Sequence, residues 1–309
     1  MTTVLVVGAA GFLGSHLARR HLDRGDIVIG IDNFATGHPR NVADITSPNF
    51  TFIEGDLLTV ELPAGVEQIY HMASPASPPK YMELAWETMD VNTIGTRRLI
   101  DYAAQHGARL LFASTSEIYG DPLVHPQPEG YWGNVNTIGP RSVYDEAKRF
   151  GETLMSHARS TGYADTALIR IFNTYGPNMD PWDGRVVSTF IRQALKGEPL
   201  TVFGTGQQTR SFCFVDDLIT GIVAVMDSGT AGPVNLGNPN EFTLLELANV
   251  VAEVLDTNVT IEHHDLPVDD PKQRQPDISL AKSTLNWEPT VQLREGVAKT
   301  AEWMRGVLG

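Results

Sequence analysis

A short apolar strand that runs into evenly spaced glycines constrains the fold of this chain more than any other feature. Residues 4–7 (VLVV) are rich in β-branched side chains, which is typical of a strand buried on both faces. Gly8, Gly11 and Gly14 follow directly, and residues 15–23 then have helical periodicity. Glycines at this spacing allow a tight turn and a close approach to a pyrophosphate, which the amides at the helix start attract. The pattern predicts a dinucleotide-binding strand, turn and helix.

The acid at the end of the second predicted strand supports this interpretation. Residues 26–31 form that strand, and Asp32 follows it. A carboxylate there accepts hydrogen bonds from both ribose hydroxyls and repels a 2′-phosphate, so NAD is favoured over NADP as the cofactor. Asp56, after the third strand, is either an adenine contact or a solvated acid at a strand end. The predicted cofactor contacts are turn residues and nearby polar side chains, namely Gly8, Gly11, Phe12, Leu13, Gly14, Asp32, Asn33 and Asp56.

Strands and helices alternate through the first half of the chain. A long helix is predicted over 85–106, closed by a glycine. Further short apolar strands are predicted over 50–54, 68–71, 109–114 and 167–172. Such alternation is typical of a Rossmann-type, doubly wound parallel sheet. We predict that this sheet forms an NAD-binding domain over residues 1–175.

The alternation loosens in the second half of the chain. Helices are predicted over 186–196 and 244–255, and residues 263–277 are predicted to form an irregular loop. A short apolar run at 234–236 is interpreted as a strand that returns to the main sheet. The second half is therefore predicted to be a smaller C-terminal α/β lobe for substrate over residues 176–309.

Composition and charge exclude several classes of partner. The net charge of −14 opposes non-specific binding to nucleic acid or to an anionic membrane. The single cysteine, Cys213, cannot form an internal disulfide, which is typical of a reducing compartment. Because the chain begins directly with a strand, without a signal peptide or a long apolar run, we expect a cytoplasmic protein. No metal site is predicted, since the histidines lack partners at ligand spacing (His71, His125, His263 and His264).

A tyrosine and a lysine at Y-x-x-x-K spacing form the candidate catalytic pair. Tyr144 and Lys148 lie one turn apart on one face of a predicted helix. The lysine ammonium and a positive nicotinamide are expected to lower the pKa of the phenol, and Lys148 could also hold the nicotinamide ribose. By spacing alone, an ordinary exposed helix pair is the better interpretation. Thr115 favours the catalytic interpretation, because it follows the strand 109–114 and open α/β sheets place ligands at such strand ends.

Longer blocks of sequence resemble a known family. Extended short-chain dehydrogenases/reductases are matched by GAAGFLG (8–14), STSEIYG (114–120), YDEAK (144–148) and RIFNTYGP (170–177). A narrower resemblance, to the UDP-glucuronate decarboxylases, rests on HMASPASPPKYM (71–82), NTIGT (92–96), residues 121–148, WDGRVVSTF (182–190), GEPLTVFGTGQQTRSF (197–212), PVNLGNP (233–239) and RQPDI (274–278). One departure is NTIGP (136–140), where that pattern has NPIGP. It lies in a loop before the catalytic helix and puts little in doubt.

The resemblance implies an NAD-dependent enzyme with a triad of Thr115, Tyr144 and Lys148, and a homodimer formed through a helix bundle. The resemblance also implies that Glu117 and Arg274 are catalytic residues. Related dehydratases carry Asp-Glu where this chain has Ser-Glu at 116–117, so the acid suited to eliminating water is missing. The resemblance further implies that a UDP-sugar is contacted by Tyr81, Asn173, Arg185, Arg210 and Arg274.

The implied reaction is decarboxylation of UDP-glucuronate to UDP-xylose through a 4-keto intermediate, with NAD regenerated in each cycle. Tyr144 removes the proton of the 4-hydroxyl, and the resulting ketone lies β to the carboxylate that leaves. A UDP-glucuronate 4-epimerase, or another nucleotide-sugar epimerase or dehydratase, is the alternative enzyme. An NAD-binding redox sensor is the alternative from another class, and the intact triad argues against it.

Overall fold

The computed structural model describes residues 1–265 and 273–309, and a parallel sheet is its largest element. The sheet contains seven strands, which are β1 (Thr3–Val7), β2 (Ile27–Asp32), β3 (Phe50–Glu54), β4 (Gln68–His71), β5 (Arg109–Thr115), β6 (Thr166–Ile171) and β11 (Val234–Leu236). Their order is β11-β6-β5-β4-β1-β2-β3, and each neighbouring pair is parallel. The predicted doubly wound parallel sheet is confirmed.

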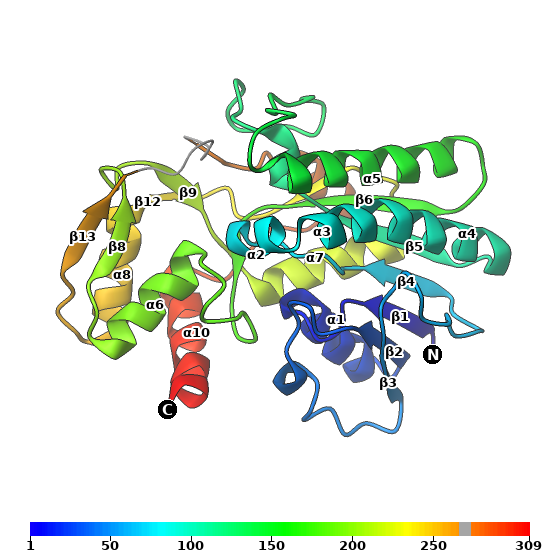
Figure 1. The fold of residues 1–309 in the computed structure, drawn as a ribbon, viewed down its shortest axis with the longest axis horizontal. Helices are drawn as coiled ribbons and strands as arrows, with labels where there is room; N and C mark the ends of the chain where they lie inside the picture. Colours follow the sequence, from blue (N-terminus) through cyan, green and yellow to red (C-terminus); the bar gives the residue numbers. More distant parts are fainter. Residues whose placement is uncertain (266–272) are drawn as a thin grey trace.

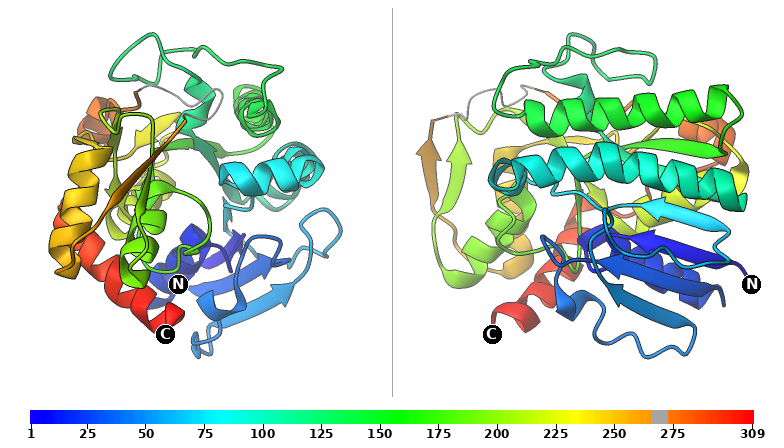
Figure 2. Two further views of the ribbon diagram at one scale, coloured as in Figure 1. Left: turned by 60° about the vertical axis from the view of Figure 1, so that its left-hand side comes forward. Right: turned by 45° about the vertical axis from the view of Figure 1, so that its right-hand side comes forward.

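Helices cover both faces of this sheet (Figures 1 and 2). One face carries α1 (Phe12–Asp23), α7 (Val215–Ser228) and α9 (Ser279–Leu285), and the other carries α4 (Thr96–His106) and α5 (Ser142–Ser160). The chain winds from β1 towards β3 in one direction and from β4 towards β6 in the other. This reversal between β1 and β4 leaves a crevice at the carboxyl ends of the strands, where such sheets bind ligands. Among the described helices, none is both long enough and apolar enough to cross a membrane.

The helix predicted over 85–106 is interrupted. It consists of α3 (Ala85–Asp90), a π-helical turn η2 (Val91–Gly95) and α4. The Asn92 amide donates to the Thr88 carbonyl oxygen at 2.8 Å and to the Ser74 hydroxyl at 2.9 Å. A π turn inserts one residue and commonly marks a functional segment. Here it turns the Asn92 side chain towards the proline-rich segment 74–79, whose last two residues begin α2 (Pro78–Glu83).

The smaller lobe lies beyond the carboxyl end of the sheet (Figure 1). Short strands pair as β8 (Leu200–Phe203) with β13 (Ile261–His264), β9 (Thr209–Ser211) with β12 (Glu241–Thr243), and β7 (Thr174–Tyr175) with β10 (Cys213–Phe214). They pack with α6 (Val186–Lys196), α8 (Leu244–Leu255) and α10 (Leu293–Leu308). The irregular loop expected over 263–277 is wrong at its start, since His263 and His264 lie in β13, and residues 266–272 lie outside the described residues. The domain boundary at residue 175 stays a prediction.

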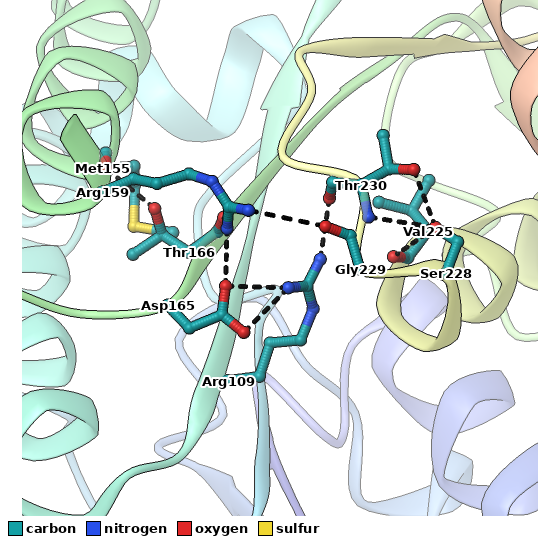
Figure 3. A network of polar contacts seen from close by, with 9 residues as sticks. All are labelled: Arg109, Met155, Arg159, Asp165, Thr166, Val225, Ser228, Gly229 and Thr230. Carbon is teal, nitrogen blue, oxygen red and sulfur yellow. Dashed lines mark hydrogen bonds and ion pairs between the residues drawn. The ribbon is translucent and has the colours of Figure 1, made fainter. Parts of the chain in front are cut away.

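A polar network ties the amino ends of the central strands together, opposite the crevice (Figure 3). Arg109 Nη1 donates to both carboxylate oxygens of Asp165 at 2.8 and 2.9 Å. Arg159 of α5 donates to the same carboxylate at 2.5 Å. Arg109 also donates to the Thr230 carbonyl oxygen at 2.7 Å, after α7. The network therefore links β5, α5, the start of β6 and the connection that leads to β11.

Candidate active site

A cavity of about 770 Å³ opens at the carboxyl ends of the strands, between the main sheet and the smaller lobe. Its wall combines segments that are far apart in the sequence, including the start of α1, the end of β5, the start of α5 and the loop before α6. It contains many of the residues singled out from the sequence, namely Phe12, Leu13, Gly14, Tyr81, Thr115, Glu117, Tyr144, Lys148, Asn173, Arg185, Arg210 and Arg274. The cavity wall does not include Gly8 and Gly11, which lie in the glycine turn, or Asp32, Asn33 and Asp56, which lie at or after the ends of β2 and β3.

The glycine turn is packed so closely that side chains at two of its positions would overlap backbone atoms of the protein. Gly8 has a φ of +88°, and a Cβ there would lie 2.7 Å from the backbone nitrogen of Ala73. A Cβ on Gly14 would lie 1.9 Å from the Gly8 carbonyl oxygen. Gly11 caps α1, whose first turn contains no acidic residue. The amides of that turn can therefore attract an anion such as a pyrophosphate, so the turn fits a dinucleotide.

Asp32, at the end of β2, is held in place by two backbone amides. Its carboxylate accepts hydrogen bonds from the Ala10 amide at 2.9 Å and the Phe34 amide at 2.8 Å. Burial raises the pKa of Asp32, although these backbone hydrogen bonds act to lower it. Asn33 Nδ2 donates to Asp56 Oδ2 at 2.9 Å, so these two predicted cofactor residues are in contact with each other.

The tyrosine of the predicted triad is buried beside the threonine. Tyr144, on α5, is 5% exposed and forms a hydrogen bond with the Thr115 side chain at the end of β5. Burial raises the pKa of the Tyr144 phenol, and the Thr115 hydrogen bond and Arg185 act to lower it. The protein groups around Tyr144 therefore raise the pKa of its phenol, whereas the sequence predicted a lowered pKa. A cationic nicotinamide placed beside the phenol would act in the lowering direction.

The lysine of the triad is enclosed by aromatic rings. Lys148 Nζ donates to the Ala113 carbonyl oxygen at 2.7 Å. It lies 4.8 Å from the centre of the Phe112 ring and 5.7 Å from that of Tyr144. Burial lowers the pKa of Lys148 to about 7, although Glu152 opposes the change. The ammonium is thus close to titration at neutral pH.

Glu117 is held between two arginines. Arg274 Nη1 donates to Glu117 Oε1, and Arg141 Nη2 donates to Oε2 at 2.6 Å. Burial acts to raise the pKa of Glu117, but the two guanidinium groups outweigh it and hold the pKa at about 2. Arg274 also donates to the Gly120 carbonyl oxygen at 2.8 Å. Glu117 is therefore an ionised, firmly oriented carboxylate at neutral pH.

The remaining predicted substrate residues surround this centre. The Tyr81 ring stacks on the Tyr144 ring, with centroids 4.9 Å apart and planes 5° apart. The buried Tyr81 hydroxyl has no hydrogen-bond partner among the described residues. Arg185 Nε donates to Asp183 Oδ2 at 2.6 Å, which orients its guanidinium at the cavity wall. Arg210 and Asn173 reach the same wall from the smaller lobe and the end of β6.

Sequence reasoning did not find two cationic residues of the cavity wall. Arg141 lies just before α5, in a loop where no periodicity assigns a face to it. Arg40 lies in the loop after β2, and its Nη2 is 3.9 Å from Asp180 Oδ1. The partners of both arginines, Glu117 for Arg141 and Asp180 for Arg40, are distant in the sequence. The spacing of Arg141 from Tyr144, one helical turn, is the single sequence signal that could have identified it.

Comparison with known proteins identifies the family. The sequence model of the NAD dependent epimerase/dehydratase family matches residues 4–237. The chain belongs to this family. The match spans the glycine turn, the triad and the return strand β11.

Relatives within the epimerase/dehydratase family are close in sequence. UDP-glucuronic acid decarboxylase 1 of Arabidopsis thaliana is 52% identical over 297 residues, which cover 96% of this chain and 68% of that protein. UDP-glucuronic acid decarboxylase 5 of the same organism is 48% identical, with 99% and 90% covered. The UDP-glucuronic acid 4-epimerase of Bacillus cereus, in complex with UDP-glucuronic acid and NAD, superimposes with a TM-score of 0.90 at 27% identity. That match covers 99% of this chain and 100% of the epimerase.

Proposed function

We propose that this chain is an NAD-dependent decarboxylase that converts UDP-glucuronate to UDP-xylose and carbon dioxide. The observation that carries the proposal is the position of the Glu117–Arg274 pair in one cavity with Thr115, Tyr144 and Lys148. The relatives named UDP-glucuronic acid decarboxylases, about half identical over nearly the whole chain, support it.

The cofactor end of the cavity is assigned to NAD. When bound, NAD accepts hydride from carbon 4 of the sugar and later returns it. The turn and the start of α1 hold the pyrophosphate, and Asp32 holds the adenosine ribose. Asp32 excludes a 2′-phosphate because its carboxylate is fixed in place by two backbone amides. The residues assigned to the cofactor are Gly8, Gly11, Phe12, Leu13, Gly14, Asp32, Asn33, Asp56, Tyr144 and Lys148.

The triad manages the proton of the 4-hydroxyl. Tyr144 accepts that proton, while Thr115 holds the phenol oxygen of Tyr144 and the 4-hydroxyl oxygen of the sugar in place. Lys148, whose pKa is about 7, stabilises the phenolate and can pass a proton on. The ketone formed at carbon 4 is β to the carboxylate on carbon 5, so loss of carbon dioxide leaves an enolate whose oxygen faces Tyr144 and Thr115. Protonation of the enolate at carbon 5, by a proton taken up from solvent, puts hydrogen where the carboxyl group was. Return of the hydride to carbon 4, with the proton held by Tyr144, then restores the 4-hydroxyl.

The UDP part and the sugar-acid part of the substrate are assigned to different arginines. Arg185 and Arg210, with Asn173, are assigned to the UDP part of the substrate. Arg274 and Glu117 are assigned to the carboxylate end, where orientation of the breaking carbon–carbon bond relative to the ketone sets the rate. Tyr81 is assigned to the sugar, because its buried hydroxyl has no partner among the described residues and its ring stacks on Tyr144.

The nucleotide sugar formed from UDP-glucuronate tests this proposal. Purified protein with NAD should yield UDP-xylose, measured by mass spectrometry, together with an equal amount of carbon dioxide. No NADH should accumulate in proportion to product, because the hydride is returned. Recovery of UDP-galacturonate, with its carboxyl group retained, would show an epimerase instead.

We propose that the chain forms a homodimer through α3 and α5. These helices lie side by side on one face of the sheet (Figure 1). Apolar side chains on this helical layer are exposed, with Trp86 at 75%, Ile94 at 58% and Phe150 at 52%. Light scattering should give twice the chain mass, and Trp86→Glu with Phe150→Glu should give a monomer. A monomeric unmodified protein would exclude this assembly.

We also propose a cytoplasmic location. The single cysteine, Cys213, is buried and reduced, which fits a compartment where thiols stay free. Fractionation of cells that produce the full-length protein, followed by immunoblotting, tests the location, and recovery in a secreted fraction would contradict it.

A further inference from the structure

A short pairing between two irregular segments brings Arg274 to the cavity. The backbone amide of Gln127 donates to the Gln275 carbonyl oxygen at 2.9 Å. The Gln127 carbonyl oxygen in turn accepts from the Asp277 amide at 3.0 Å. These two hydrogen bonds form a parallel bridge between Gln127 and Pro276. Because Arg274 immediately precedes the bridged residues, the place of its backbone depends on this pairing.

The backbone cannot extend the pairing, because prolines occupy positions 126, 128 and 276. Proline has no N–H group, so it donates no hydrogen bond to a neighbouring strand. The Gln127 side chain adds two further bonds. Its Oε1 accepts from the Gln275 amide at 2.9 Å, and its Nε2 donates to the Val124 carbonyl oxygen at 2.8 Å. Gln127 is 0% exposed, so water cannot replace these bonds without a change of structure.

Asn235, on β11, joins the same pairing to the part of the chain that carries Glu117. Its Nδ2 donates to one carbonyl oxygen on each paired segment, to that of Gln127 at 2.9 Å and to that of Asp277 at 3.1 Å. Its Oδ1 accepts from the Tyr119 hydroxyl at 2.8 Å. Tyr119 is the last residue of the short 3₁₀ helix η3 (Ser116–Tyr119), in which Glu117 lies. Asn235 is 0% exposed, and its one buried amide therefore connects the Arg274 segment to η3.

Neither side chain can act on the substrate directly. The described wall of the cavity includes Arg274 and Glu117 but neither Gln127 nor Asn235. The Arg274 side chain is 3% exposed, and its guanidinium donates to Glu117 and to the Gly120 carbonyl oxygen. An effect of Gln127 on the reaction must therefore pass through the place that Arg274 takes beside Glu117.

We infer that Gln127 and Asn235 are positioning residues, which hold the Arg274 segment against η3 and thereby serve the loss of carbon dioxide rather than the oxidation at carbon 4. This inference rests on the proposed function. Oxidation is assigned to Tyr144 and Lys148, which lie on α5 and not on the paired segments. Carbon dioxide leaves fastest when the breaking bond is aligned with the ketone, so a small shift of the group that orients the carboxylate has a large effect on that step.

Two rates, measured on the NAD-loaded protein, test the inference. Single-turnover reduction of NAD by UDP-glucuronate reports oxidation, and release of labelled carbon dioxide from the carboxyl carbon reports decarboxylation. Gln127→Met keeps the length of the side chain but removes both of its hydrogen bonds, so the Gln275 amide can be satisfied only if the segment shifts. The rate of carbon dioxide release should fall roughly 10- to 100-fold, while NAD reduction should change by less than about threefold. Bound NADH should therefore accumulate in the variant.

Thr166→Val is the matched control. Thr166 lies at the amino end of β6, opposite the crevice (Figure 3), is 2% exposed, and donates to the Met155 carbonyl oxygen at 2.8 Å. The substitution removes a buried hydrogen bond far from Arg274 and should change neither rate. Asn235→Ala is the second variant, because it releases the paired segments from η3. It should show the same imbalance, with carbon dioxide release lowered more than NAD reduction.

A double variant tests whether Gln127 acts through Arg274. In an Arg274→Ala background the guanidinium is already absent, so adding Gln127→Met should lower carbon dioxide release by less than about a further threefold. A further loss as large as that in the otherwise unmodified protein would overturn the inference. Equal loss of both rates in Gln127→Met, or no loss of either, would also overturn it. Failure of the unmodified enzyme to release carbon dioxide would instead refute the proposed function.

Discussion

Lys148→Met should make the folded protein more stable and much less active. Lys148 is 3% exposed, and its ammonium lies against the rings of Phe112 and Tyr144. Among residues 1–265 and 273–309, the one hydrogen bond that it donates is to the Ala113 carbonyl oxygen. Methionine has a similar length and no charge, so it fills the space and removes the cost of burying the ammonium.

The size of the effect follows from the pKa. Burial lowers the pKa of Lys148 from 10.5 to about 7. This difference corresponds to a penalty of about 5 kcal/mol on the charged form in the folded state. Losing the hydrogen bond to Ala113 costs about 1–3 kcal/mol. We therefore expect Lys148→Met to raise the free energy of unfolding by about 2–4 kcal/mol at pH 6.

The stability gained by Lys148→Met should decline as the pH rises. The penalty is fully present below pH 7, where lysine is charged in both the folded and the unfolded chain. It declines as pH rises towards 10.5, because the folded chain is then neutral and the unfolded chain gradually becomes so. At about pH 9 the penalty is about 2 kcal/mol, so the lost hydrogen bond should cancel the advantage.

Urea unfolding of both proteins at pH 6 and pH 9, without added nucleotide, measures this difference. Single-turnover reduction of NAD, followed by absorbance, should fall on the order of 10²–10⁴ in the variant, because the phenolate loses its cationic neighbour. A variant less stable than the unmodified protein at pH 6, by an amount that is the same at pH 9, would refute the reasoning about burial.

Three further predictions address other parts of the molecule. Tyr144→Phe keeps the stacking on Tyr81 but removes the base, so NAD reduction should fall at least 10²-fold, on the order expected for a general base; reduction at near the original rate contradicts the assignment. Asp32→Ala should reduce the preference for NAD over NADP by about tenfold or more, as expected when one buried charge contact is lost. The Kd values of the two cofactors measure this preference. Equal binding of NAD and NADP by the unmodified protein would exclude Asp32 as the residue that selects NAD. Asp165→Asn breaks a partly exposed network at the far end of the sheet, and should lower the free energy of unfolding by about 1 kcal/mol without changing turnover; altered turnover would show that this network is coupled to the active site.

Local patterns predicted much of the fold. The strands over 50–54 and 68–71 and the helices over 186–196 and 244–255 have the predicted bounds, because their apolar content or periodicity is a property of adjacent residues. The strands beside the glycine turn, β1 and β2, differ from their predicted bounds by one residue. The interruption at residues 91–95 was not predicted, since a π turn depends on the contacts of Asn92 with Ser74. β13 was missed for the same reason, because a polar strand is held by its pairing with β8.

The sequence by itself determined the residue types of the site and their local geometry. The Y-x-x-x-K spacing places Tyr144 and Lys148 on one face of a helix, and the glycine spacing requires a tight turn wherever it occurs. Tertiary structure alone decided the electrostatics. The pKa of Lys148 depends on how deeply it is buried, and the partners of Glu117 come from segments 24 and 157 residues away. Burial and charge pairing are properties of the folded surroundings, so no local pattern of residues carries them.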